Sequence, residues 1–261
     1  MESLESELAR ARAIDVSTIA DAIESIGFEC TDCGLCCRGI DDEHTATVFP
    51  HEIRTLESAT DSTWRDVARP MPYGLSQRDD GVIEGETFEW VLQTNDCGDC
   101  VFYDDGEDDN DEITAPGDSG KRAAETGAEK NENTQRGDKT ERNGGCTVYD
   151  HRPMICRTYP FSIAFAGTSQ PMGTAVDSVG IVQIHECEGL GRDIDRSDAE
   201  ELARTLKTRT VRELEEAIGV RDAYNGDRLP PGSIIVYDSE GAKTVDGAVY
   251  TADDESAEDS T

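Results

Sequence analysis

Apolar residues recur at helical spacing at the start of the chain. Residues 2–27 place leucine, isoleucine and alanine three or four positions apart, which predicts two helices. Asp15 or Ser17 could cap the second helix, and Gly27 is placed to end it. We therefore expect N-terminal helices over residues 1–28.

Short elements are expected next. Residues 45–50 predict a short strand, and 51–58 predict a short helix. A second helix is expected from Asp61 onward, with Pro70 and Pro72 ending it.

Alternating apolar positions predict several further strands. Residues 82–93 are expected to form a strand pair, and 161–166 and 178–185 one strand each. In the first of these, period-two spacing places three side chains on one face: Phe88, Trp90 and Leu92.

The C-terminal part predicts one helix and a hairpin. Ser197 and Glu200 form a capping box, and the apolar positions that follow keep helical spacing as far as Gly219, the expected stop. Residues 233–237 and 247–251 could pair as the arms of a hairpin.

A change in composition divides the chain. Residues 104–145 lack aromatic side chains and are rich in Asp, Glu, Gly, Asn and Lys, so they cannot bury enough apolar area to offset ordering entropy. We predict a disordered acidic insert there, within a cysteine-cluster domain over 29–192. A helix over 193–226 and a hairpin with an acidic tail over 227–261 would follow.

The chain is strongly acidic. Its 57 Asp and Glu against 24 Lys and Arg give a net charge of −33, and the acidity is spread along the sequence. Nucleic-acid binding needs basic residues, so this class of partner is not expected. The charge favours a halophilic adaptation, in which acidic surfaces stay hydrated in high salt; binding of a cationic partner is the alternative.

The termini and hydropathy predict a cytoplasmic protein. The first residues, Met-Glu-Ser-Leu-Glu, have neither a basic nor an apolar signal region, and no stretch is long and apolar enough for a membrane span. In a reducing compartment, clustered cysteines favour metal or redox chemistry over disulfides.

Eight of the nine cysteines form one pattern, which opens with a C-x-x-C-x-x-C-C run and continues at four distant positions. The predicted metal ligands are Cys30, Cys33, Cys36, Cys37, Cys100, Cys146, Cys156 and Cys187. Thiolates are soft ligands that select zinc, iron–sulfur clusters or copper(I). Gly34 suits the tight turn that the run requires. Because the ligands are far apart in sequence, a metal would join distant segments and contribute folding energy.

The adjacent cysteines add a constraint. In an extended backbone the side chains of Cys36 and Cys37 point to opposite sides, which favours different metals or one bridged cluster. Eight thiols then suggest two four-ligand sites or one multinuclear cluster.

Several known cysteine motifs are absent. The haem-attachment C-x-x-C-H, the bacterial ferredoxin run and the radical-SAM C-x-x-x-C-x-x-C do not match. Cys97 and Cys100 alone resemble a thioredoxin pair, but no βαβ unit surrounds them. Closed structural zinc, an iron–sulfur or redox-active iron site, and other uses such as disulfides stay open.

Side chains near the cysteines could support the centre. The candidates are Arg152, Arg157, His151, His185 and Tyr149. Arginines could offset thiolate charge or pair with carboxylates, and histidines could be ligands or orient them. Glu52 and Asp150 could act as bases, although nothing in the sequence distinguishes them from other acidic residues.

These motifs together resemble the YkgJ-like cysteine-cluster family, a CxxCxxCC zinc- or iron-chelating domain. The resemblance rests on Cys30–Arg38, on Cys100-Val-Phe-Tyr, on the Arg-Pro and Cys-Arg pairs of 146–161, and on Cys187–Gly191. Cys97 looks like an addition to the common set, as does the insert between Cys100 and Cys146.

The resemblance implies a cytoplasmic metal-chelating protein whose metal ion is zinc or iron, with 4Fe-4S as one form. Members are often described as iron–sulfur oxidoreductases, and flagellin lysine methylases look like distant relatives, but no glycine-rich cofactor loop is recognisable here. We expect a small α+β domain organised by metal, with flanking helices. A structural-zinc interaction module and a metal-dependent oxidoreductase or protein-modifying enzyme are the alternatives. The expected partners are metal ions, with no membrane and no nucleic acid.

Overall fold

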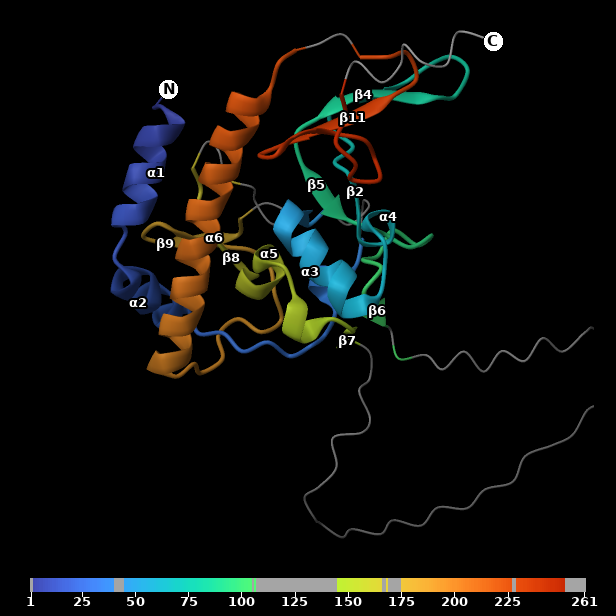
Figure 1. The fold of residues 1–261 in the computed structure, drawn as a ribbon. Coiled ribbons are helices and arrows are strands. Elements are labelled where there is room, and N and C mark those ends of the chain that lie inside the picture. Colours follow the sequence, from blue (N-terminus) through green and yellow to red (C-terminus); the bar gives the residue numbers. More distant parts are fainter. Residues whose placement is uncertain are drawn as a thin grey trace, which may run out of the picture.

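The computed structural model describes residues 2–39, 45–104, 106, 145–165, 168, 175–226 and 229–251. Within them the protein combines helices with four small sheets, which confirms the predicted α+β class. Figure 1 shows helices from both ends of the chain on one side and the largest sheet on the other. No helix in this part of the chain is long and apolar enough to cross a membrane.

The two predicted N-terminal helices are confirmed as α1 (Leu4–Ala13) and α2 (Val16–Ile26). Asp15 caps α2, since its carboxylate accepts a hydrogen bond from the backbone N–H two residues on (2.9 Å). Gly27 ends the helix with a φ of 76°. A Cβ at Gly27 would lie 2.4 Å from the carbonyl oxygen of Arg192, so only glycine allows this close approach.

The C-terminal helix α6 (Arg196–Ala223) lies within the predicted range 193–226, but it begins before the predicted cap Ser197 and continues beyond the predicted stop Gly219. Asp195, not Ser197, is its N-cap residue, and Gly219 does not end it. A Cβ at Gly219 would lie 2.6 Å from the Cβ of Ser239. This glycine therefore serves close packing of α6 against a neighbouring turn, a use that a sequence cannot distinguish from a helix stop.

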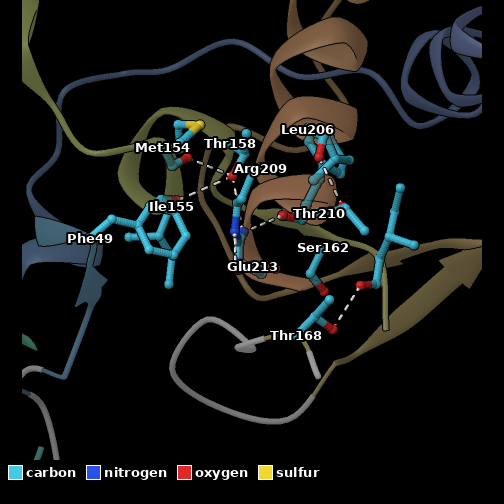
Figure 2. Close-up of polar contacts among 12 residues, drawn as sticks. Phe49, Met154, Ile155, Thr158, Ser162, Thr168, Leu206, Arg209, Thr210 and Glu213 are labelled. Atoms are coloured by element: carbon cyan, nitrogen blue, oxygen red, sulfur yellow. Dashed lines mark hydrogen bonds and ion pairs between the residues drawn. The ribbon is translucent and has the colours of Figure 1, made fainter. Parts of the chain in front are cut away.

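Helix α6 packs against α1, α2 and α5 (Met154–Thr158). Buried Arg209 joins α6 to α5: its Nε donates to Glu213 (2.8 Å) and its Nη1 to the hydroxyl of Thr158 (3.0 Å; Figure 2). Burial raises the pKa of Glu213 to about 7, against the charge of Arg209, which lowers it. The apolar core beside this pair includes Ile19, Ile23, Phe161, Val182, Ala203 and Leu206.

A second core lies around a three-stranded antiparallel sheet in the order β1-β5-β2. Its elements are β1 (Thr47–Val48), α3 (Pro50–Thr60), α4 (Trp64–Val67), β2 (Ala68–Pro70) and β5 (Trp90–Leu92). The predicted end of α4 at Pro70 is wrong, because the helix ends at Val67 and Pro70 closes the edge strand β2. An edge strand tolerates proline, which has no N–H to donate.

The largest sheet has the order β12-β11-β4-β3, with β11 parallel to β4. Its strands are β3 (Leu75–Gln77), β4 (Ile83–Thr87), β11 (Ile234–Asp238) and β12 (Gly241–Lys243). Buried Asp238 connects it to the second core, because its Oδ2 accepts from Lys243 (2.7 Å) and from the indole N–H of Trp90 (2.9 Å).

Two small sheets complete the described part. Their strands are β8 (Phe161–Ser162), β9 (Asp177–Val179) and β10 (Val182–Ile184) in one, and β6 (Tyr103–Asp104) and β7 (Gly145–Cys146) in the other. The strand expected over 178–185 is instead a hairpin, in which β9 and β10 turn at Gly180 with a φ of 61°. The strand expected over 161–166 forms only as β8.

The strand pair expected over 82–93 is wrong in its pairing. Strands β4 and β5 both form, but they belong to different sheets. Phe88 lies between them and is 44% exposed, whereas Trp90 and Leu92 are buried, so the three do not share a buried face. The chain changes sheets at this point, and period-two spacing carries no information about such a change.

The second arm of the C-terminal hairpin is also misplaced. Strand β12 follows β11 after a tight turn, in which Asp238 accepts a hydrogen bond from the N–H of Glu240 (2.9 Å). Residues 247–251 form no strand, and they contact β12 through an isolated bridge between Val249 and Lys243 and a hydrogen bond from the N–H of Tyr250 to the carbonyl oxygen of Ala242 (2.8 Å).

The predicted acidic insert begins and ends in described strands, since Asp104 pairs with Gly145. Apart from these two residues and Gly106, the segment lies outside the described residues, as does the acidic tail after Thr251.

Candidate metal centre

One cavity of about 200 Å³ brings the predicted ligands together. Its lining includes Cys30, Cys33, Cys36, Cys37, Cys100, Cys146, Cys156 and Cys187. The ninth cysteine, Cys97, is exposed and is not part of the lining, and all nine are free thiols. The structure thus gathers the eight predicted thiols, while their roles as ligands stay a prediction.

The first cysteine run turns at two residues with a left-handed backbone conformation and packs against an aromatic side chain. Asp32 has a φ of 55° and Gly34 a φ of 70°, and a single turn of 3₁₀ helix follows over Leu35–Cys37. The N–H of Cys37 donates to the carbonyl oxygen of Gly34 (2.8 Å). A Cβ at Gly34 would lie 2.1 Å from the ring of Tyr103, so glycine is required both by the turn and by this contact.

The expectation that Cys36 and Cys37 point to opposite sides is wrong. It assumed an extended backbone, but the pair lies in the 3₁₀ turn, and both side chains line the cavity. Their sulfurs are 3.9 Å apart. Two sulfurs on one tetrahedral zinc, with bonds of about 2.3 Å, would be about 3.8 Å apart. Adjacency in sequence therefore does not force these two thiols onto different metals.

Backbone hydrogen bonds hold Cys100 and Cys146 against this turn. The N–H of Cys100 donates to the carbonyl oxygen of Cys37 (2.8 Å), and the N–H of Tyr103 donates to the carbonyl oxygen of Cys100 (2.9 Å). Tyr103 in turn pairs with Cys146 across β6 and β7. Arg38 donates from Nε to the Tyr103 hydroxyl (3.0 Å). Tyr103 is therefore the centre of the contacts that join three ligand segments.

Glu52 positions the helix that carries Cys156. Its Oε1 accepts from the N–H of Met154 (2.8 Å) at the start of α5, and its Oε2 accepts from the N–H of Phe49 (3.1 Å). Burial raises the pKa of Glu52, although the hydrogen bonds from these two N–H groups act to lower it. The sequence indicated Glu52 only as one acidic residue among many, because its partner lies 102 positions away.

Cys187 is brought to the cavity by contacts between two loops. The N–H of Glu29 donates to the carbonyl oxygen of Gly189 (3.1 Å), and Phe28 forms a bridge with Leu190. The N–H of Gly189 donates to the sulfur of Cys187 (3.4 Å). The loop that follows α2 and the loop that follows β10 thus reach the cavity together.

The thiols differ in electrostatic surroundings. Burial raises the pKa of Cys100 to about 12 and that of Cys156 well above its usual range. The pKa of Cys36 is lowered to about 7, first by its hydrogen bond with Cys37 and also by the charge of Arg152, while the same bond raises the pKa of Cys37. Since metal ligands are thiolates, metal binding would release protons from the buried thiols.

Neighbouring thiols also act on each other's pKa. For both Cys156 and Cys187 the main cause of a raised pKa is burial, and the charges of neighbouring thiols come after it. The neighbours that act on Cys156 are Cys100, Cys36 and Cys146. Those that act on Cys187 are Cys33, Cys36 and Cys30.

Three of the predicted supporting side chains line the cavity: Arg152, Arg157 and Tyr149. The guanidinium carbon of Arg152 lies 3.5 Å from the centre of the Tyr149 ring, and its Nε donates to the Tyr149 carbonyl oxygen (3.0 Å). Cationic groups beside thiolates offset their negative charge.

Neither histidine predicted to support the centre is part of the cavity lining. His151 is exposed and is not part of the cavity lining. His185 is buried, with its Nε2 3.0 Å from the hydroxyl of Ser162, and is also outside the lining. Their supporting roles stay a prediction.

A family model described as "CxxCxxCC: Putative zinc- or iron-chelating domain" matches residues 29–179. The chain belongs to this family. The match confirms the resemblance that the cysteine motifs indicate, and it covers every cavity cysteine except Cys187, which the sequence pattern also predicted as a ligand. No curated protein and no solved structure was found to match the chain.

The donor set fits the metals of this zinc- or iron-chelating family, since both metals accept thiolate ligands. No three His, Cys, Asp or Glu side chains among the described residues are already arranged to hold an ion. The cavity of about 200 Å³ has room for several water molecules, since one water needs about 10–15 Å³.

Proposed function

We propose that this member of the family is a cytoplasmic protein in which the eight cavity cysteines hold zinc or iron as a resident centre. The observation that supports the proposal most strongly is the convergence of eight free thiols on one cavity. Free thiols are typical of a reducing compartment, where metal binding is their commonest clustered use.

The main role of the bound metal, in this proposal, is to join distant segments. The thiols come from the 30–37 turn, from the neighbourhood of β6 and β7, from α5 and from the loop after β10. A thiolate-bound metal would cross-link these segments and add its binding free energy to folding. The protein would then be a metal-stabilised module that presents its surface to a partner.

A redox centre is the second candidate, and the exposure of part of the cluster favours it. Cys30 and Cys33 are exposed, so a metal held there would be open to solvent. Arg152 and Arg157 in the lining could offset the negative charge of an iron–sulfur cluster. In that case the protein would be an iron–sulfur oxidoreductase or a protein-modifying enzyme.

Anaerobic purification followed by elemental analysis and an absorption spectrum tests both candidates. Brown protein with visible absorption would support the iron–sulfur candidate, and colourless zinc-loaded protein would support the structural one. Cys97→Ser, which changes the exposed cysteine outside the cavity, is the matched control and should keep its full metal content. The Cys36→Ser and Cys37→Ser variants should bind less metal. Full occupancy in both variants, or metal-free wild-type protein, would contradict the proposal.

A further inference from the structure

We propose that the eight cavity cysteines form two four-thiol metal sites. The inner site consists of Cys37, Cys100, Cys146 and Cys156. The outer site consists of Cys30, Cys33, Cys36 and Cys187. This assignment rests on the proposed function, since it distributes among the thiols the metal that the function requires.

Packing separates the two sets. Cys100 is 3% exposed and belongs to the core around the first sheet, and the cysteines that pack against this core are Cys37, Cys146 and Cys156. No member of the outer set packs against that core in the described part of the chain. Cys30 and Cys33 are exposed instead. The inner set thus packs against apolar core side chains, whereas the outer set does not, and two of its four members are exposed.

Backbone hydrogen bonds follow the same division. In the inner set Cys100 is bonded to Cys37, and Tyr103 links Cys100 to Cys146. In the outer set the bond between Glu29 and Gly189 brings the loop of Cys30 to the loop of Cys187. The inner thiols are therefore held by the sheet core, while the outer thiols lie where two loops meet.

Cys36 lies at the junction of the two sets, with its sulfur 3.9 Å from that of Cys37. Tetrahedral structural sites take four ligands, and the inner set already supplies four without Cys36. The outer set has three thiols without it and needs a fourth.

The two sites should differ in how readily they lose metal. An inner metal is enclosed by core side chains and by the β6–β7 pair, so its release requires the core to open. An outer metal bridges two loops near solvent, so a chelator can reach it while the core stays packed. The outer site is accordingly the exchangeable one, and the inner site is the structural one.

Stepwise chelation of the full-length zinc-loaded protein tests this order without any substitution. EDTA is added in steps, free thiols are alkylated with iodoacetamide at each step, and the labelled cysteines are identified by peptide mass spectrometry. Loss of the first half of the zinc should expose Cys30, Cys33, Cys36 and Cys187 to labelling, with the inner thiols labelled only later. Labelling of all eight in parallel with zinc loss would overturn the division and would indicate a single shared cluster.

Variants of the outer site provide an independent test. Cys30→Ser and Cys187→Ser should retain about half of the wild-type zinc and a native circular dichroism spectrum, because the inner site keeps its four ligands. The Cys97→Ser control should retain all of it. Loss of all zinc in the outer variants, or loss of their fold, would overturn the division while leaving the proposed function intact. A wild-type protein that binds no zinc or iron would overturn both.

Discussion

Glu52 connects the sheet core to the helix that carries Cys156, and its removal should weaken both the fold and the metal centre. The carboxylate accepts from the N–H groups of Phe49 and Met154. In Glu52→Ala both amides lose their acceptor. Each unsatisfied buried donor costs about 1–3 kcal/mol, and water can reach part of this site, so we expect the free energy of unfolding to fall by about 2–4 kcal/mol. Glu52→Gln keeps one acceptor oxygen and should lose about half as much.

Urea denaturation followed by circular dichroism measures this loss, and competition with a chelator measures metal retention. Both quantities should be highest in the wild type, lower in Glu52→Gln and lowest in Glu52→Ala, because the start of α5 positions Cys156. Thr55→Ala, on the exposed face of the same helix, is the control and should change stability by no more than about 0.5 kcal/mol. A Glu52→Ala variant as stable and as metal-loaded as the Thr55→Ala control would refute this positioning role.

Three further predictions concern other parts of the molecule. Because the pKa of Glu213 is raised from 4.5 to about 7, its stabilising contribution is present below pH 4.5 and is lost as the pH rises through about 7. The urea midpoint of the wild type should therefore fall over this pH range, and it should fall less in Glu213→Gln. The same pH dependence in both proteins would contradict the raised pKa of Glu213. Gly34→Ala should lower the free energy of unfolding by about 1–2 kcal/mol for the left-handed backbone alone, with a further loss from the clash with Tyr103. It should also reduce the metal content. A variant with the wild-type melting temperature and metal content would show that the turn is misassigned. The net charge of −33 predicts loss of circular dichroism signal in dilute buffer and its recovery in concentrated KCl, whereas an unchanged spectrum would count against adaptation to salt.

The sequence predicted those elements whose determinants are local. Helices α1 and α2 follow from apolar spacing and from the caps Asp15 and Gly27, all within a few residues of one another. The eight thiols were recognised by residue type and spacing, since few other uses concentrate so many cysteines. These inferences required no knowledge of long-range contacts.

The failures involve contacts between distant residues. Gly219 lies inside α6, where it allows the close approach of Ser239, and β4 and β5 enter different sheets because their partners come from elsewhere in the chain. Glu52 acquires its role from Met154, which is far away in sequence. The adjacent Cys36 and Cys37 lie in a helical turn and not in an extended backbone, so both side chains line the same cavity. Contacts between distant segments determine each of these features, and the periodicity of apolar residues carries no information about such contacts.

Eight thiols, and not Cys97, are proposed to hold the metal. Alkylation of the protein as purified under anaerobic conditions, with the metal content measured on the same sample, tests this proposal most directly. Only Cys97 should be labelled rapidly in the metal-loaded native protein, and all nine cysteines should be labelled after chelation and denaturation. Rapid labelling of the cavity cysteines in metal-loaded protein, at the rate of Cys97, would contradict it.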